Sequence, residues 1–135
     1  CTAPQNFYIP ANGIKTAAGV VSFDDFAEKL IANINSLIAN PKAGPFVLGA
    51  VQSDRTTSRV RDAEHLPGKV WLKSRTFENP LFKKARVITP VIVEVDAAKK
   101  EIFSKELFGP IALLIKTQNT DQSISLAQEM AMEHG

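Results

Sequence analysis

Apolar residues recur at intervals of three and four along one long stretch of the chain, residues 22–39. Ser22 has a side chain suited to the N-terminal cap of a helix, and Asp24 and Asp25 suit the positive end of the helix dipole. Asn40 and Pro41 end the pattern. The spacing predicts an amphipathic helix over 22–39, packed on a sheet through one apolar stripe. The stripe consists of Phe23, Phe26, Ala27, Leu30, Ile31, Ile34, Leu37 and Ile38.

Several other stretches are typical of β-strands. Residues 6–10 combine aromatic and β-branched residues and lead into an Ala-Asn-Gly turn. Residues 86–95 are rich in valine and isoleucine, and Pro90 within them indicates an edge, a bulge or a strand that begins after the proline. Residues 111–116 are almost continuously apolar, as in a strand covered on both faces. A shorter strand is predicted at 70–72.

The remaining segments predict helices and loops between these strands. Residues 41–49 contain two prolines and two glycines and indicate a loop. A polar helix over 54–63 would be capped by Asp54, and residues 97–105 would form a turn or a short helical segment. A last helix, 121–133, would be capped by Thr120 and would bury Ile124, Ala127, Met130 and Ala131. Strands and helices alternate, which predicts an α/β fold: a layered sheet with flanking helices and at least some parallel pairing.

Composition limits the classes of protein that fit. The chain has 135 residues, the size of one domain or part of one, and a net charge of +2. Its lysines and arginines form no stripe apart from acidic neighbours, so we expect no nucleic-acid partner. No apolar run approaches the roughly 20 residues that span a bilayer, so we expect no membrane insertion. A single cysteine cannot form an internal disulfide, which favours the cytoplasm.

That single cysteine is Cys1, at the first position of the sequence. It is either a residue without a role at a chain end or a nucleophile, since a thiolate attacks carbonyl carbon well. A lipid-modified cysteine is a third reading, although a flexible polar spacer would then be expected where residues 6–9 predict a strand. A fourth is an N-terminal nucleophile hydrolase, whose free amine acts as the base.

Glu106 is the other residue that stands out. It lies just before a Gly-Pro corner at the start of the most apolar strand, with Phe108 beside it. The plain interpretation is a loop carboxylate next to an aromatic residue that fills the core. The functional one is that the carboxylate accepts hydrogen bonds from a ribose diol while the aromatic face lies against a flat heterocycle. His65 and His134 show no metal-ligand spacing, and no glycine-rich phosphate-binding loop follows a strand.

Together, two motifs give the sequence a family resemblance. The segment Cys1-Thr2-Ala3-Pro4-Gln5, then a strand and a long helix, is followed by the motif Glu-Leu-Phe-Gly-Pro at 106–110. This arrangement resembles the aldehyde dehydrogenase superfamily along the whole chain. The Glu-x-Phe-Gly-Pro motif is the more specific part. The Thr-Ala-Pro-Gln that follows the cysteine resembles, more narrowly, the aldehyde dehydrogenases of phenylacetic acid degradation.

The resemblance implies roles for three residues. Cys1 would be the catalytic nucleophile that attacks the aldehyde substrate. Glu106 would hold the nicotinamide ribose of NAD or NADP, and Phe108 would limit the movement of the nicotinamide ring. It also implies that residues 1–135 are part of the nucleophile-bearing catalytic domain of a homo-oligomeric enzyme. The cofactor-binding domain and the general base would lie outside them, so we expect this chain alone to be inactive.

Two non-redox alternatives remain open from the sequence. Both make Cys1 the key residue, in an N-terminal-cysteine hydrolase or in a lipid-anchored binding domain. The residues encoded just upstream discriminate among the three, because a Gly-Gln-x segment before Cys1 supports the dehydrogenase and a signal peptide or propeptide supports a rival.

Overall fold

A four-stranded sheet organises the chain, and the computed structural model describes it over residues 4–134. The strand order is β1-β6-β5-β4. The first three strands run parallel, with Tyr8 level with Ile115 and Ile115 level with Val95, whereas β4 is antiparallel to β5. The predicted parallel pairing is therefore confirmed. The bounds are β1 (Asn6–Pro10), β4 (Val70–Leu72), β5 (Val91–Asp96) and β6 (Ile111–Thr117).

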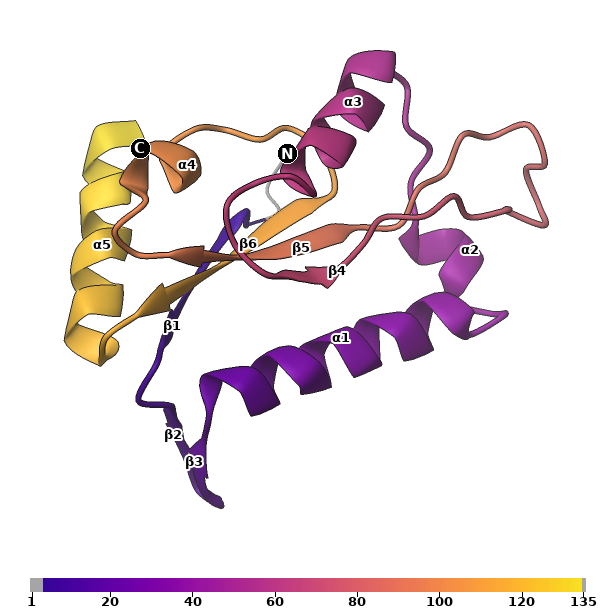
Figure 1. Cartoon of the computed structure of the whole chain (residues 1–135). Coiled ribbons are helices and arrows are strands. Elements are labelled where there is room, and N and C mark those ends of the chain that lie inside the picture. Colours follow the sequence, from indigo (N-terminus) through magenta and orange to yellow (C-terminus); the bar gives the residue numbers. More distant parts are fainter. Residues whose placement is uncertain (1–3, 135) are drawn as a thin grey trace.

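Helices cover both faces of this sheet. One long helix runs along one face, and three others lie on the opposite side, as Figure 1 shows. The long helix is α1 (Phe23–Ala39), and the others are α3 (Asp54–Ala63), α4 (Lys100–Phe103) and α5 (Thr120–His134). The predicted α/β fold, a layered sheet with flanking helices, is confirmed.

Alternation along the central strands divides the core into two halves. Successive residues of a strand point to opposite faces of the sheet. In β5, the side chains of Val91, Val93 and Val95 point to the face that α3, α4 and α5 cover. Ile92 and Leu114 point the other way and pack with α1. The strands β5 and β6 are thus covered on both faces, which explains why their sequences are almost continuously apolar.

Helix α1 confirms the pattern that predicted it. Ser22 is the N-cap, and its Oγ accepts a hydrogen bond of 3.1 Å from the Asp25 backbone N–H. Phe23, Ala27 and Ile38 are buried. Leu37, at the edge of the predicted stripe, remains 47% exposed.

Two elements were not predicted. A small hairpin of β2 (Ile14–Thr16) and β3 (Gly19–Val21) links β1 to α1. One short helix, α2 (Gly44–Val47), interrupts the segment predicted as a loop. Strand β5 begins directly after Pro90, which is one of the three arrangements that the proline allowed.

Both later helix caps lie one residue before the predicted ones. The Ser53 Oγ, not Asp54, caps α3 by accepting from the Arg55 N–H at 3.2 Å. Asn119 rather than Thr120 caps the N-terminus of α5, because its Oδ1 accepts a hydrogen bond of 2.9 Å from the Gln122 N–H. Asparagine and serine suit this position because their side chains are short, so that the side-chain oxygen reaches the free N–H groups of the first turn.

The predicted buried face of α5 was wrong apart from Met130. Ile124 is 51% exposed, and the alanines at 127 and 131 are also exposed. Ser123 faces inward instead, where its hydroxyl lies 2.6 Å from the Thr117 hydroxyl at the end of β6. This buried hydrogen bond fixes the rotation of the helix, and apolar spacing alone does not reveal it.

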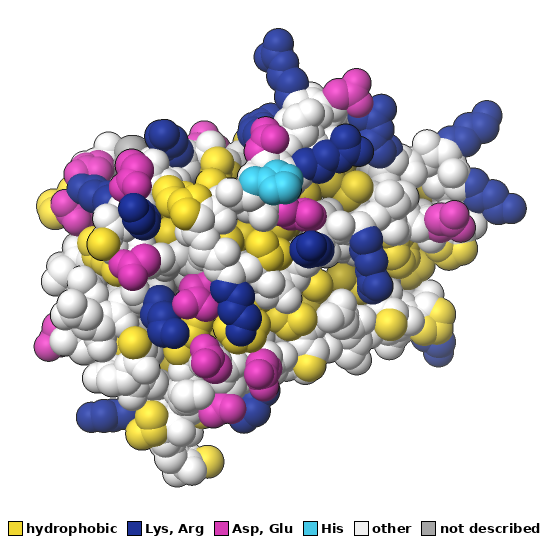
Figure 2. Space-filling model, in the orientation of Figure 1, with side chains coloured by type: hydrophobic (Ala, Val, Ile, Leu, Met, Phe, Trp, Pro, Cys, Tyr) yellow, Lys and Arg dark blue, Asp and Glu magenta, His cyan; other side chains and the backbone are white. Residues whose placement is uncertain are grey.

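Charged side chains of both signs lie on the face that Figure 2 shows. Figure 2 shows basic and acidic side chains interspersed on the side of α5, and mainly basic ones around α3. The arginines of α3 at 55 and 61 are exposed, whereas Arg59 is partly buried. Within residues 4–134, no helix has the length and apolarity needed to cross a membrane.

Candidate active site

The three parallel strands bring three distant segments to one end of the sheet. Because β1, β5 and β6 run in the same direction, the residues before each strand lie together at the end where the strands begin. These residues surround a hollow of about 310 Å³. Its lining comes from Pro4 and Gln5, from Pro90, and from residues 106–112. The two segments that the sequence singled out therefore meet here.

Gln5 joins these two segments. Its side-chain Nε2 donates to the carbonyl of Lys105 at 3.0 Å, and its Oε1 accepts from the Leu107 N–H at 2.6 Å. Its backbone carbonyl accepts from the Leu113 N–H of β6 at 2.8 Å. The chain just after Cys1 is thus attached directly to the backbone on both sides of Glu106.

Phe108 is presented at the rim of the hollow rather than in the core. Its side chain is 53% exposed, and the guanidinium carbon of Arg59 lies 5.6 Å from the centre of its ring. A guanidinium over an aromatic ring is attracted by the negative face of the ring. The plain interpretation of Phe108 as a core-filling residue is therefore wrong.

A sharp corner at Gly109 and Pro110 shapes the floor of the site. Gly109 has a φ of +148°, a conformation that favours glycine. Its carbonyl accepts from the Ile111 N–H at 2.8 Å, and the Pro110 carbonyl accepts from the Val91 N–H at 2.9 Å. The corner is therefore attached to the first residues of β5 and β6.

A second, more apolar hollow of about 580 Å³ adjoins the first. The two share Pro90, Phe108, Gly109 and Pro110, so the Phe108 side chain borders both. The other walls come from residues 47–53, from Thr56 and from Ile88. A ligand beside Phe108 thus meets an apolar surface on the α3 side and the carboxylate of Glu106 on the other side.

The chemistry of these side chains fits one part of a nicotinamide cofactor. Glu106 is exposed at the rim, and an ionised carboxylate accepts hydrogen bonds from hydroxyl groups. The exposed face of Phe108 offers a flat apolar surface to a planar ring. A sugar with neighbouring hydroxyls joined to a planar heterocycle satisfies both groups at once.

The structure places two of the three residues named from the sequence. Glu106 and Phe108 lie together at the hollow, whereas Cys1 lies outside the described residues. Gln5 and Arg59 belong to the site and were not singled out. Proximity to the cysteine was the available signal for Gln5, but no sequence pattern indicates that Arg59 reaches Phe108 across the fold.

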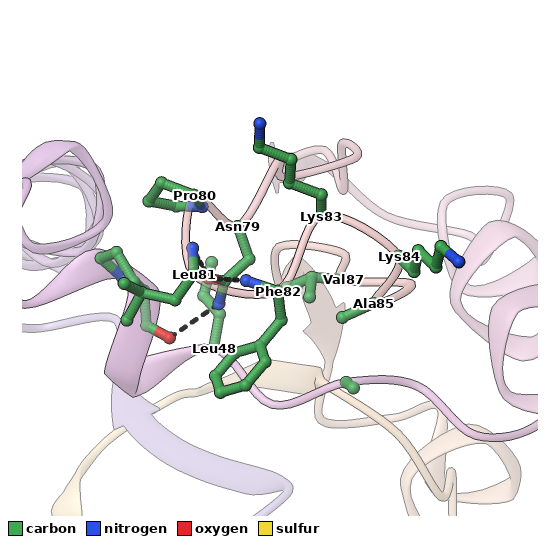
Figure 3. Close-up of a pocket in the computed structure, with 11 residues that line it drawn as sticks. Leu48, Asn79, Pro80, Leu81, Phe82, Lys83, Lys84, Ala85 and Val87 are labelled. Carbon is green, nitrogen blue, oxygen red and sulfur yellow. Dashed lines mark hydrogen bonds between the residues drawn. The ribbon is translucent and has the colours of Figure 1, made fainter.

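A larger hollow lies elsewhere in the described part of the chain. It measures about 850 Å³ and lies between α2 and the loop of residues 79–87 (Figure 3). Asn79 holds this loop, because its Nδ2 donates to the Pro45 carbonyl and its Oδ1 accepts from the N–H groups of Leu81 and Phe82. Two lysines are the charged side chains of its lining, so we do not assign the chemistry to this hollow.

Comparisons with known proteins point to one family. The model of the aldehyde dehydrogenase family matches residues 18–132, which include Glu106 and Phe108. A search of curated proteins found no match. Among solved structures, an NAD-dependent aldehyde dehydrogenase from Burkholderia multivorans is 43% identical with a TM-score of 0.90, over 97% of this chain and 23% of that one.

Two more distant structures share the fold. A putative aldehyde dehydrogenase from Bacillus subtilis is 24% identical with a TM-score of 0.56, over 78% of this chain and 23% of that one. An NAD-dependent benzaldehyde dehydrogenase from Corynebacterium glutamicum is 18% identical with a TM-score of 0.57, over 91% of this chain and 31% of that one. The chain thus spans less than a third of the length of each structure that it matches.

Proposed function

Because the chain belongs to the aldehyde dehydrogenase family, we propose that it is the nucleophile-bearing part of an enzyme that oxidises an aldehyde to its acid with NAD or NADP. The observation that carries this proposal is the hollow in which Glu106 and Phe108 meet the segment that follows Cys1. Residues 1–135 correspond in this proposal to part of one catalytic domain. The cofactor-binding domain lies outside them.

Cys1 acts as the nucleophile in this reaction. Its thiolate sulfur bonds to the carbonyl carbon of the aldehyde, and the carbonyl electron pair moves to the oxygen. NAD(P), when bound, supplies the oxidant that takes up the hydride lost from that carbon. The carbon is left as a thioester of Cys1. Water then attacks the thioester and gives up a proton to the solvent, the carbon–sulfur bond breaks, and the acid leaves while the Cys1 thiolate is restored.

Glu106 and Phe108 hold and orient the cofactor. The carboxylate of Glu106 accepts hydrogen bonds from the ribose hydroxyls next to the nicotinamide, and the ring of Phe108 restricts the position of the nicotinamide. Correct placement of two reacting groups lowers the barrier because their relative freedom is already lost on binding. These residues thus act mainly through cofactor binding and alignment.

Three finer features complete the proposal. The substrate belongs to phenylacetic acid degradation, on the resemblance of residues 2–5 to the aldehyde dehydrogenases of that route. The protein works in the cytoplasm as a homo-oligomer. Assembly is proposed on the family resemblance of the sequence.

Product analysis tests this function. The protein at its full natural length is incubated with NAD or NADP and a panel of aliphatic and aromatic aldehydes, and the organic products are separated by chromatography. We expect the matching acid and NAD(P)H in equal amounts. Conversion of an aldehyde without reduction of cofactor, or hydrolysis of esters and amides as the sole activity, would favour the cysteine hydrolase instead.

A further inference from the structure

The Gln5 side chain holds the two peptide groups that flank Glu106. The Lys105 carbonyl belongs to the peptide before Glu106, and the Leu107 N–H belongs to the peptide after it. A primary amide both accepts and donates, so a single side chain satisfies both groups. Peptide groups are planar, so fixing both of them fixes the direction in which the Glu106 side chain leaves the backbone.

The Gln5 side chain is itself firmly placed. Its backbone carbonyl is bonded to β6 through Leu113, and its Nε2 also lies 3.2 Å from the Asn6 Oδ1. The Asn6 side chain in turn donates to the Phe103 carbonyl at 2.8 Å. The start of β1 is thus attached to the chain at Phe103 and Lys105 before Glu106 and at Leu107 and Leu113 after it.

The Glu106 carboxylate has no other support in the described part of the chain. It is exposed, and among residues 4–134 the structure shows no hydrogen bond or ion pair that orients it. The position from which its side chain starts therefore depends on its own backbone alone. That backbone is held by Gln5, four residues after Cys1.

We propose that Gln5 is a positioning residue, which fixes the backbone that carries Glu106 relative to the nucleophile segment through its paired hydrogen bonds to Lys105 and Leu107. This inference rests on the proposed function, because it assigns Gln5 a role through the cofactor contact of Glu106. Loss of the two bonds lets the backbone at Glu106 move away from the nucleophile segment, and cofactor binding weakens.

The test is a double-mutant cycle in the protein at its full natural length. Gln5→Met keeps the length of the side chain and removes both hydrogen bonds. We expect it to raise the KM for NAD(P) roughly fivefold, the factor that corresponds to the net contribution of about one hydrogen bond. The KM for the aldehyde should change little. In a Glu106→Ala background the same Gln5→Met change should have no further effect, because Gln5 acts through Glu106.

Additive effects of the two substitutions would overturn the proposal, as would an unchanged KM for NAD(P). Hydrogen exchange gives a readout that does not depend on activity, since the Leu107 amide should exchange faster in Gln5→Met. Faster exchange with unchanged KM would show that the contact is only structural. Gln128→Met, on the exposed side of α5, is the matched control and should alter neither quantity.

A second variant covers the case in which Gln5→Met does not fold. Gln5→Glu still accepts from the Leu107 N–H but sets a carboxylate oxygen against the Lys105 carbonyl, so its KM for NAD(P) should also rise above wild type. A KM equal to wild type would count against the pairing. Failure of the function itself looks different: a wild-type protein that forms no NAD(P)H with any aldehyde overturns both the proposed function and this inference.

Discussion

Gly109 lies against Thr56 of α3, so closely that a Cβ atom at position 109 would come within 3.1 Å of the Thr56 Cγ2. The same atom would lie 3.5 Å from a methyl group of Val60. This contact joins the corner below the candidate site to the helix that carries Arg59. The Glu-Leu-Phe-Gly-Pro motif thus contains a packing requirement in addition to its proposed cofactor contacts.

We expect Gly109→Ala to destabilise the protein by about 1–3 kcal/mol, because the side chain adds strain at a φ of +148° and crowds α3. The free energy of unfolding from urea titration measures this. Gly49→Ala is the control, since a Cβ there meets nothing within 4 Å. Equal stabilities of the two variants would contradict the packing argument.

Phe108→Ala should impair cofactor binding more than folding. The side chain is 53% exposed, so little buried area is lost, whereas the proposed stacking surface disappears. We expect the Kd for NAD(P) to rise on the order of fivefold, with a change in unfolding free energy of about 1 kcal/mol or less. Phe82→Ala is matched in residue type and exposure, at 65%, and lies in the other hollow. If Phe82→Ala weakened cofactor binding as much as Phe108→Ala, the site would be misassigned.

Asn79 should be important for stability although it lies far from the proposed chemistry. It is 5% exposed, and its side chain makes three hydrogen bonds of 2.9 to 3.2 Å to the backbone. Replacement by alanine removes all three of these partly buried hydrogen bonds, so we expect a loss of about 1–3 kcal/mol. Asn33→Ala, at an exposed position of α1, should be neutral or slightly stabilising, and calorimetry distinguishes the two.

Lys100 gives a prediction for alkaline pH. Hydrogen bonds from its ammonium group to Glu129 and Glu133 raise the pKa of Lys100 above its ordinary value of 10.5. A raised pKa in the folded state stabilises that state below pH 10.5, and the contribution is lost as the pH rises through the folded value. The stability difference between wild type and Lys100→Met should therefore be present at neutral pH and vanish in strong alkali.

The control for this titration keeps the charge at position 100. Lys100→Arg should retain its advantage over Lys100→Met in strong alkali, because arginine stays protonated there. Denaturant titrations at neutral pH and above pH 11 measure both differences. A wild-type advantage that persisted unchanged in strong alkali would show that the ion pairs with Glu129 and Glu133 are not its source.

The sequence predicts those helices and strands whose buried residues show a regular spacing within one segment of the chain. The stripe of α1 and the apolar runs of β5 and β6 reflect simple periods, which a single segment displays. The rotation of α5 did not follow, because the hydrogen bond between Ser123 and Thr117 depends on where β6 ends. The hairpin at Ile14–Val21 was also missed, since three-residue strands are too short to show a period.

The candidate site, too, was predictable only in part from the sequence. Glu106 and Phe108 stand out next to a Gly-Pro corner, and parallel strands bring them to the segment after the cysteine. The contributions of Gln5 and Arg59 arise from contacts between residues far apart in the sequence. Side chains of this kind acquire a role only through the fold.

Replacement of Cys1 shows whether it is the nucleophile. Aldehyde-dependent formation of NAD(P)H is followed by absorbance for the wild-type protein at its full natural length and for Cys1→Ala. We expect steady NAD(P)H formation by the wild type and none above background by Cys1→Ala. Cys1→Ser should be strongly impaired, because a hydroxyl is a weaker nucleophile than a thiolate. NAD(P)H formation by Cys1→Ala at the wild-type rate would contradict it.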